Sequence, residues 1–162
     1  MHGQWISHAI EAIMTVSSLD LELLLPLAVA WAEEQAAVIA QIGYPLDQEL
    51  AALATGVGVT APGRIRIVEL DLIALPEDAC LRQAAAATGL LGPATIGLTL
   101  GHGIYIRRGH ANRRVLSHEF RHVHQYETSG SVEAFLREYL SQLVAHGYLG
   151  APYEIDARRH EV

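Results

Sequence analysis

Ser117-His118-Glu119-Phe120-Arg121-His122 places two histidines four residues apart, with a glutamate directly after the first. The strong helix breakers near this segment are Gly109 and Gly130, one on each side of it, so we expect a helix between them. Its core face is predicted from three apolar residues at helical spacing, Leu116, Phe120 and Val123. A second face carries His118, Glu119, His122, Gln125 and Tyr126, and we expect it to line a cleft.

The two histidines of this helix form half of a predicted metal site. Residues four apart lie on one face of a helix, so His118 and His122 reach the same cation while Glu119 points at the metal-bound water. This spacing is typical of zinc metallopeptidases. His124 projects to the other side of the helix and is predicted not to be a ligand. Arg121 also lies off the metal face and is expected to be solvated or ion-paired.

A third ligand is needed, because catalytic zinc normally takes three protein groups and leaves the fourth position to water. After a turn at residues 129–131 the pattern predicts a second helix over 132–146, ended by residues 147–150. Pro152 suits the start of a short third helix over 153–158. Glu154 on this helix is the predicted third ligand. Asp156 and His160 stay open as alternatives, and an exposed ion pair between Glu154 and Arg158 explains the same residues without a metal.

The pattern His118-Glu119-x-x-His122, a following helix, then Glu154 with Ala157 resembles the gluzincin branch of the zincin metallopeptidases. It is most similar to small bacterial minigluzincin domains, whose active helix continues as His-x-x-Gln, here His122 to Gln125. The resemblance covers residues 65–162. Many gluzincins carry an aspartate four residues after the ligand glutamate to orient a histidine, and this chain has Arg158 there, with Asp156 as the nearest carboxylate.

The resemblance implies a zinc-dependent metallopeptidase, a hydrolase that acts on peptides or proteins. By this resemblance, His118, His122 and Glu154 are expected to bind Zn²⁺, and Glu119 is expected to be the general base that passes a proton from the attacking water to the leaving amine. A proton donor to the oxyanion is also expected. The sequence does not choose among four neighbours of the site, Tyr126, His146, Tyr148 and Tyr153.

The segment before the active helix is predicted to be mostly β-structure. Residues 95–100, a turn at Gly101-His102-Gly103 and residues 104–107 predict a hairpin, in which His102 is exposed. Residues 64–72 predict a half-buried strand, and residues 77–87 a short helix. Zincins place an antiparallel edge strand beside the cleft, where an extended substrate adds as another strand. The strand over 95–100 is the candidate for that role.

The N-terminal third is predicted to be helical. Leu19 to Ile42 is expected to form a buried helix, because its acidic residues leave an apolar run shorter than the roughly 20 residues that span a bilayer. No basic segment precedes it, so we predict no signal peptide and a cytoplasmic location. Asp47 is expected to cap a second helix, from residue 48 to 57.

These elements predict an α+β fold, with a short antiparallel sheet packed on the active helix, further helices, and an N-terminal helical region. We expect a single domain over residues 1–162, with a helical lobe over 1–63 and a zincin-like metal-binding core over 64–162. The chain has 162 residues, of which 51% are hydrophobic, enough to bury a core.

Composition excludes several classes of function. The chain has no lysine, which excludes a Walker-type phosphate site and Schiff-base chemistry. Its net charge of −7 argues against nucleic acid as a partner. The arginine pairs at 107–108 and 113–114 are expected to be a solvated rim. Cys80, the one cysteine, excludes an intrachain disulfide and is predicted to be a small core residue.

Two hypotheses remain, and the oligomeric state stays open in both. The first is the zinc peptidase. The second is a noncatalytic or degenerate zincin domain that acts as a metal-stabilised protein-interaction module. Glu119 favours the first, because a structural metal site has no use for a base beside the metal.

Overall fold

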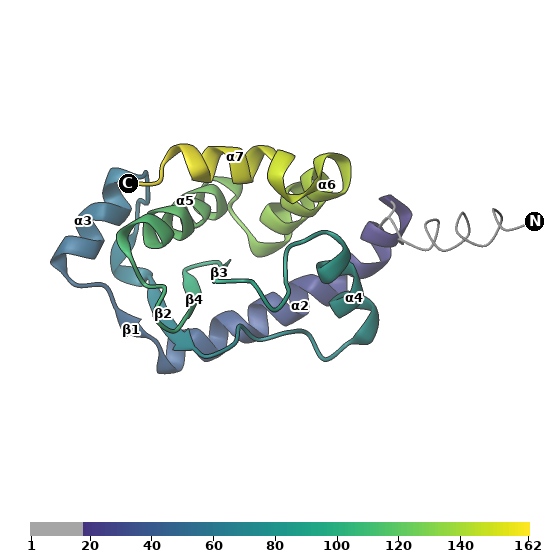
Figure 1. Cartoon of the computed structure of the whole chain (residues 1–162), viewed down its shortest axis with the longest axis horizontal. Coiled ribbons are helices and arrows are strands. Elements are labelled where there is room, and N and C mark those ends of the chain that lie inside the picture. The colour runs from purple at the N-terminus through teal and green to yellow at the C-terminus, as the bar shows by residue number, and fades with distance from the viewer. Residues whose placement is uncertain (1–17) are drawn as a thin grey trace, which may run out of the picture.

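The structure, a computed structural model, describes residues 18–162 and has helices on both sides of a small sheet (Figure 1). Its elements in chain order are α2 (Ser18–Ile42), β1 (Tyr44–Pro45), α3 (Gln48–Gly56), the 3-10 turn η1 (Pro62–Arg64), β2 (Arg66–Leu70), α4 (Ala79–Ala87), β3 (Gly97–Leu100), β4 (Gly103–Arg107), α5 (Arg113–Ser129), α6 (Val132–Gly150) and α7 (Pro152–Arg159). The predicted α+β class is confirmed.

The sheet is mixed, with strand order β1-β2-β4-β3. The predicted hairpin is present, since β3 pairs antiparallel with β4. The predicted short antiparallel sheet or hairpin corresponds to β3 and β4, whereas β2 and β4 run parallel and are joined by a crossover that contains α4. β2 is also not half-buried: Ile67 and Val68 point to opposite faces and both are buried, because helices cover both sides of the sheet.

On one side of the sheet, α5 and α3 pack against β2 and β4. The predicted core stripe of α5 is confirmed, since Leu116, Phe120 and Val123 are all buried there. Asn112 caps α5 by accepting a hydrogen bond from Val115 N (3.1 Å), and Gly130 ends the helix in the left-handed conformation at φ 85°. Asp47 caps α3 as predicted.

On the other side, α2 packs against the sheet and α6, with α4 beside it (Figure 1). The expectation that α2 is a buried helix is wrong: Leu25, Ala28 and Ile39 are buried, but Leu23 on the opposite face is 76% exposed. By length and composition, Asp20–Ile42 is long and apolar enough to cross a membrane, contrary to the expected short run. One stripe of this helix nevertheless belongs to the core of the described part of the chain.

Three local predictions need correction. Cys80 is exposed, because α4 buries Leu81 and Ala85, one helical turn apart, and turns its neighbour outward. Helix α4 begins at residue 79, since the Asp78 side chain caps it. His102 is largely buried, because its Nε2 lies 3.0 Å from Glu127 Oε1 at the end of α5.

The second helix also differs from its predicted bounds. Helix α6 continues to Gly150, but Gly147 has non-helical angles (φ 68°, ψ 170°) and kinks it within the predicted break. The third helix forms with Pro152 at its first position, as predicted.

Candidate metal centre

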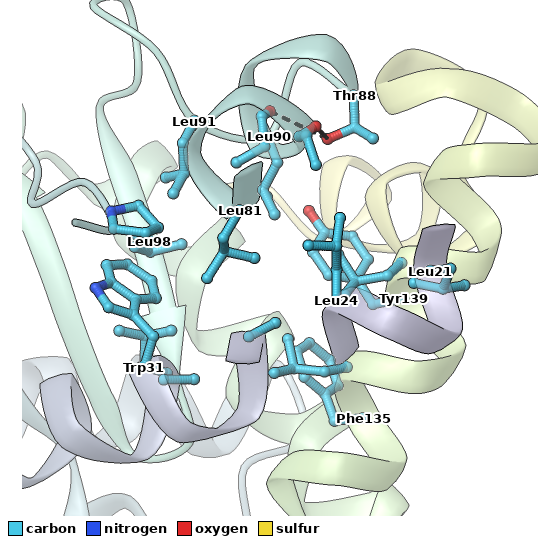
Figure 2. Close-up of a pocket in the computed structure, with 18 of the residues that line it drawn as sticks. Leu21, Leu24, Trp31, Leu81, Thr88, Leu90, Leu91, Leu98, Phe135 and Tyr139 are labelled. Atoms are coloured by element: carbon cyan, nitrogen blue, oxygen red, sulfur yellow. Dashed lines mark hydrogen bonds between the residues drawn. The ribbon is translucent and has the colours of Figure 1, made fainter. Parts of the chain in front are cut away.

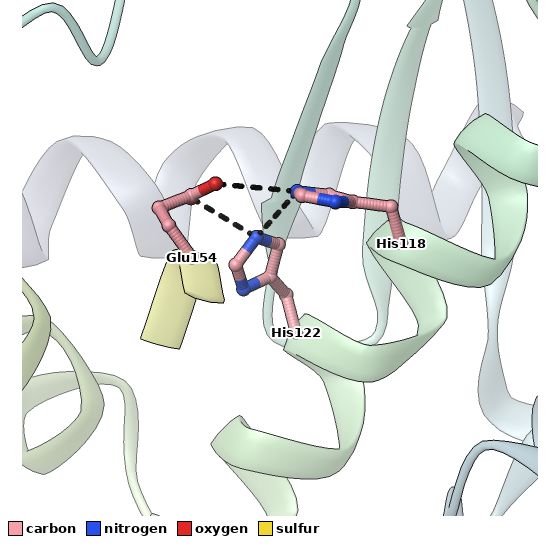
Figure 3. Close-up of side chains that lie close together, drawn as sticks. All are labelled: His118, His122 and Glu154. Atoms are coloured by element: carbon pink, nitrogen blue, oxygen red, sulfur yellow. Dashed lines mark hydrogen bonds and ion pairs between the residues drawn. The ribbon is translucent and has the colours of Figure 1, made fainter. Parts of the chain in front are cut away.

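Helices α5 and α7 bring His118, His122 and Glu154 together (Figure 3). The two Nε2 atoms lie 3.1 Å apart, and the Glu154 oxygens lie 3.3 Å from His118 Nε2 and 3.2 Å from His122 Nε2. Atoms bonded at about 2.1 Å to one tetrahedral ion lie about 3.4 Å from one another. The three side chains therefore have the spacing that a single metal ion requires, and this group can hold one.

The protonation of the two histidines also fits a metal ion. His118 Nδ1 lies 3.0 Å from a carboxylate oxygen of Glu161, and His122 Nδ1 lies 2.8 Å from Gln125 Oε1. Both acceptors carry no proton, so each Nδ1 is the donor. In the neutral rings both Nε2 atoms then present lone pairs to each other and to the Glu154 carboxylate, and this arrangement requires a cation or an added proton between them.

Glu154 is held as a buried anion. Its side chain is 1% exposed, and Tyr139 of α6 donates a hydrogen bond to Oε1 at 2.6 Å. Burial works against ionisation, but the contacts with His118, His122 and Tyr139 outweigh it and hold the pKa of Glu154 well below its ordinary value. In the described part of the chain, Glu154 Oε2 is the buried side-chain atom that receives no hydrogen bond, and it faces the histidines.

The surroundings of His118 also favour a positive charge between the three side chains. Burial opposes its charged form, yet the carboxylates of Glu154, Glu119 and Glu161 more than compensate, and the pKa of His118 is raised above its ordinary value. A proton and a metal ion therefore compete for this position.

A hydrogen-bond network fixes α7 on α5. Gln125 donates to Asp156 Oδ2 (2.8 Å) and to the Tyr153 carbonyl (3.0 Å), which turns its own oxygen toward His122. Arg121 forms a two-pronged ion pair with the same Asp156 (2.8 and 3.2 Å). Asp156 thus supports the metal group through Gln125 without joining it.

Glu161 supports the other histidine. Its Oε1 accepts from His118 Nδ1, and its Oε2 accepts from Arg114 at 3.1 Å. Carboxylates in this position fix the ring orientation of a metal-binding histidine and raise its basicity. Glu161 therefore fills the role that Arg158 cannot fill four residues after Glu154. The sequence pattern does not predict this contact, because Glu161 lies beyond the predicted helix and 43 residues from His118.

Glu119 is fixed against the edge strand β3. Thr99 donates to its Oε2 at 2.6 Å and contacts its carbonyl oxygen at 3.2 Å. A Cβ added at Gly97 would lie 2.2 Å from Glu119 Oε1, so only glycine leaves room for the carboxylate there. The glutamate is held beside the two histidines, and its partners come from a segment about twenty residues earlier.

A cleft of about 570 Å³ opens over these groups. Its walls include β3, the loop before β3, the start of α5 and the end of α6, and among its lining residues are His118, Glu119, His122, Tyr148, Glu154 and Arg158. Figure 3 shows the three metal-binding candidates pointing toward one another from α5 and α7. Of the predicted cleft-facing residues of α5, His118, Glu119 and His122 line the cleft, whereas Gln125 and Tyr126 do not.

Of the four candidate proton donors, Tyr148 lines this cleft. Burial, followed by the charges of Glu154 and Glu119, raises its pKa, so its hydroxyl keeps its proton. The other three lie elsewhere: Tyr126 packs edge-on against His102, Tyr153 stacks on Phe135, and His146 is exposed. The kink at Gly147 separates Tyr148 from the regular part of α6.

The remaining predicted residues are placed away from the metal group. His160 Nδ1 lies 2.8 Å from the Asp156 carbonyl, and His124 Nδ1 lies 2.8 Å from the Gly58 carbonyl. Arg158 contacts Glu154 Oε2 at 3.7 Å, but Glu154 is buried, so this is not the exposed helix pair weighed as an alternative. Of the expected rim arginines, Arg108, Arg113 and Arg114 are exposed and paired with carboxylates.

Comparison of the chain with models of protein families, with curated proteins and with solved structures finds no match.

Proposed function

We propose that this protein is a zinc-dependent metallopeptidase in which Glu119 is the general base, as its resemblance to gluzincins implies. One observation carries the proposal: three donor atoms with the spacing of a single ion lie at the floor of a cleft, beside a buried glutamate that is not one of them. A structural metal site normally has four protein ligands and no open side.

The donor set favours zinc. Two imidazoles and one carboxylate form the ligand set of catalytic zinc in several peptidases, whereas magnesium and calcium prefer sites built from oxygen alone. Zinc in such a site, when bound, acidifies a water molecule and polarises a carbonyl group.

The protein residues supply the other steps. Glu119 takes a proton from the attacking water and passes it to the leaving amine. Tyr148 donates a hydrogen bond to the charge that develops on the carbonyl oxygen. Strand β3 ends the sheet order among the described strands and lines the cleft with Gly97, Leu98 and Thr99, so an extended peptide can pair with it. These roles support a peptide as substrate.

The decisive experiment combines metal analysis with activity. Protein purified without added metal should hold about one zinc per chain, and His118→Ala should lose it. Glu119→Gln should keep zinc and lose hydrolysis of a peptide library, because its amide cannot accept the proton. Hydrolysis that survives in Glu119→Gln would contradict the mechanism. Zinc binding without any hydrolysis in the unaltered protein would favour the noncatalytic interaction module.

The role of Glu161 has its own test. Glu161→Ala should weaken zinc binding about 10- to 100-fold in competition with a chelator, because His118 loses its Nδ1 acceptor. Arg114→Gln is the matched control, since it removes the exposed ion pair and leaves the contact between Glu161 and His118. Equal losses in both variants would mean that the ion pair, not the histidine contact, supports the site.

A further inference from the structure

A second hollow, lined by Leu98, Thr99 and Leu100 of β3 among other residues, lies beside the cleft (Figure 2). It has a volume of about 80 Å³ and is bordered by α2, α4 and α6. Figure 2 shows Trp31, Leu81 and Leu98 on one side of this space and Leu24, Phe135 and Tyr139 on the other. Its walls are almost entirely apolar.

The side-chain hydroxyl groups of this cavity are already occupied. Thr88 Oγ1 donates within α4, Thr99 Oγ1 donates to Glu119, and the Tyr139 hydroxyl donates to Glu154. A buried water needs two to four polar partners, and cavities lined by apolar side chains stay dry and bind apolar guests. The cavity therefore suits an apolar group.

The cavity and the cleft share a wall. Six residues line both spaces: Leu90, Leu91, Leu98, Thr99, Phe135 and Tyr139. Two of them, Thr99 and Tyr139, donate hydrogen bonds to Glu119 and Glu154. A group in the cavity thus lies one layer of side chains from the candidate base and metal ligand.

We propose that this cavity receives a branched aliphatic side chain of the peptide bound in the cleft, at a position next to the bond that is cleaved. The inference rests on the proposed peptidase function and adds its specificity. The side chain enters past Leu90 and Leu91, which lie in the irregular loop between α4 and β3.

The size of the cavity sets the preferred side chain. A cavity of about 150 Å³ holds benzene, so about 80 Å³ holds roughly half as many carbons, which matches valine or leucine and not phenylalanine. A charged side chain is disfavoured, because the walls are almost entirely apolar and carry no charged group to pair with it. The expected order of preference is leucine or valine, then alanine, with aspartate last.

A filling variant tests the cavity directly. Ala85 is buried on α4 and lines the cavity, so Ala85→Leu adds about the volume that the guest would occupy. Ala87→Leu is the matched control, because Ala87 is exposed on the same helix and lines neither space. If Ala85→Leu loses its helical circular dichroism, Ala28→Leu fills the same cavity from α2.

The experiment measures peptide binding to zinc-loaded Glu119→Gln, alone and combined with each filling variant. Each buried methylene contributes about fourfold in affinity, so a leucine peptide should bind on the order of 50-fold more tightly than its alanine counterpart. The methyl NMR signals of Leu81 and Leu136 should shift with the leucine peptide only. Ala85→Leu should reduce the preference to less than about threefold, and Ala87→Leu should keep it.

The outcomes separate the two proposals. Equal binding of leucine and alanine peptides, or a leucine preference that survives Ala85→Leu, overturns the cavity proposal, even if the unaltered zinc protein hydrolyses both peptides. Leucine-selective binding that Ala85→Leu abolishes supports it. If that binding occurs while the unaltered zinc protein cleaves no peptide, the peptidase proposal fails and the cavity stays assigned to aliphatic side chains.

Discussion

The two faces of the sheet are packed differently. On the α5 face, six residues are 0% exposed and form one cluster with α3: Ile65, Ile67, Ile104, Ile106, Phe120 and Val123. On the α2 face, a cavity of about 80 Å³ remains between the helices, and Leu23 of α2 is exposed to solvent.

The more closely packed face is the one against which α5, the helix of the two candidate histidine ligands, is packed. His118 and His122 project from the helix whose opposite side is embedded in the closely packed cluster, so the cluster fixes the height and rotation of their rings. The α2 face carries no metal ligand among the described residues and contains the void. The closely packed face therefore supports the helix whose two histidine rings must be held in position to share one metal ion.

The largest predicted effect is the loss of a large side chain from the α5 face. Phe120→Ala should lower the free energy of unfolding by about 3–5 kcal/mol in urea denaturation, because the buried ring leaves a cavity. Leu24→Ala on the α2 face should cost only about 1 kcal/mol, since Leu24 is half-buried and already borders a void. Equal losses would contradict the difference between the faces.

The next largest effect on stability is expected at Glu127, near the end of α5, which joins this helix to residues 60–61 and to His102. Glu127 accepts hydrogen bonds from Thr60 N (2.7 Å), Thr60 Oγ1 (2.8 Å) and Ala61 N (3.0 Å), and contacts His102. Burial opposes its ionisation, but these bonds prevail and hold the pKa of Glu127 below its ordinary value of 4.5. Glu127→Gln should cost about 1.5–3 kcal/mol at pH 7.

The lowered pKa of Glu127 makes its contribution to stability depend on pH. Because the folded-state pKa is lowered, the stabilisation by Glu127 is complete above the unfolded-state value and is lost as the pH falls through the folded-state value. The difference in unfolding free energy between the unaltered protein and Glu127→Gln should therefore shrink below about pH 4.5. A difference that stays constant from pH 7 to pH 3 would mean that the charge of Glu127 contributes nothing.

Enlarging a buried side chain should also distinguish the two faces. Ala54→Leu, in the closely packed cluster, should destabilise by about 1–3 kcal/mol, because the added atoms have no space. Ala85→Leu, at the cavity, should change stability by less than about 1 kcal/mol. Thermal unfolding of both variants checks this, and a loss in Ala85→Leu as large as in Ala54→Leu would show that the cavity is closed in solution.

The smallest effect is expected on the exposed side of α2. Leu23→Ser should change the free energy of unfolding by less than about 0.5 kcal/mol, because the side chain is 76% exposed. Denaturation at two protein concentrations checks this. A larger, concentration-dependent loss would reveal that self-association buries this side chain.

Much of the α5 face was predictable, because its signals are local. The spacing of Leu116, Phe120 and Val123 predicts which side of α5 is buried. Asp47 predicts the start of α3 from one capping side chain. Glu154 follows from the helix that Pro152 begins, and the structure brings it to the two histidines, whereas Asp156 and His160 lie outside the group.

The missed features are contacts between distant segments. Gly97 against Glu119, Tyr139 with Glu154, and Glu161 with His118 depend on how strands and helices dock, which a periodic pattern does not contain. The same reason explains the errors at His102 and Cys80. His102 is buried because the end of α5 packs beside its turn. Cys80 is exposed because its neighbours on α4 supply the buried face of that helix.

The mixed sheet also sets an order of assembly. Parallel strands β2 and β4 pair residues 37 positions apart, such as Arg66 with Gly103, and such non-local pairing is slow. Helices α5, α6 and α7 follow one another directly and carry all three candidate ligands, so they meet through shorter loops. We expect β3, which a tight turn joins to β4 and which lies close in sequence to α5, to dock on this helix before β2 pairs with β4.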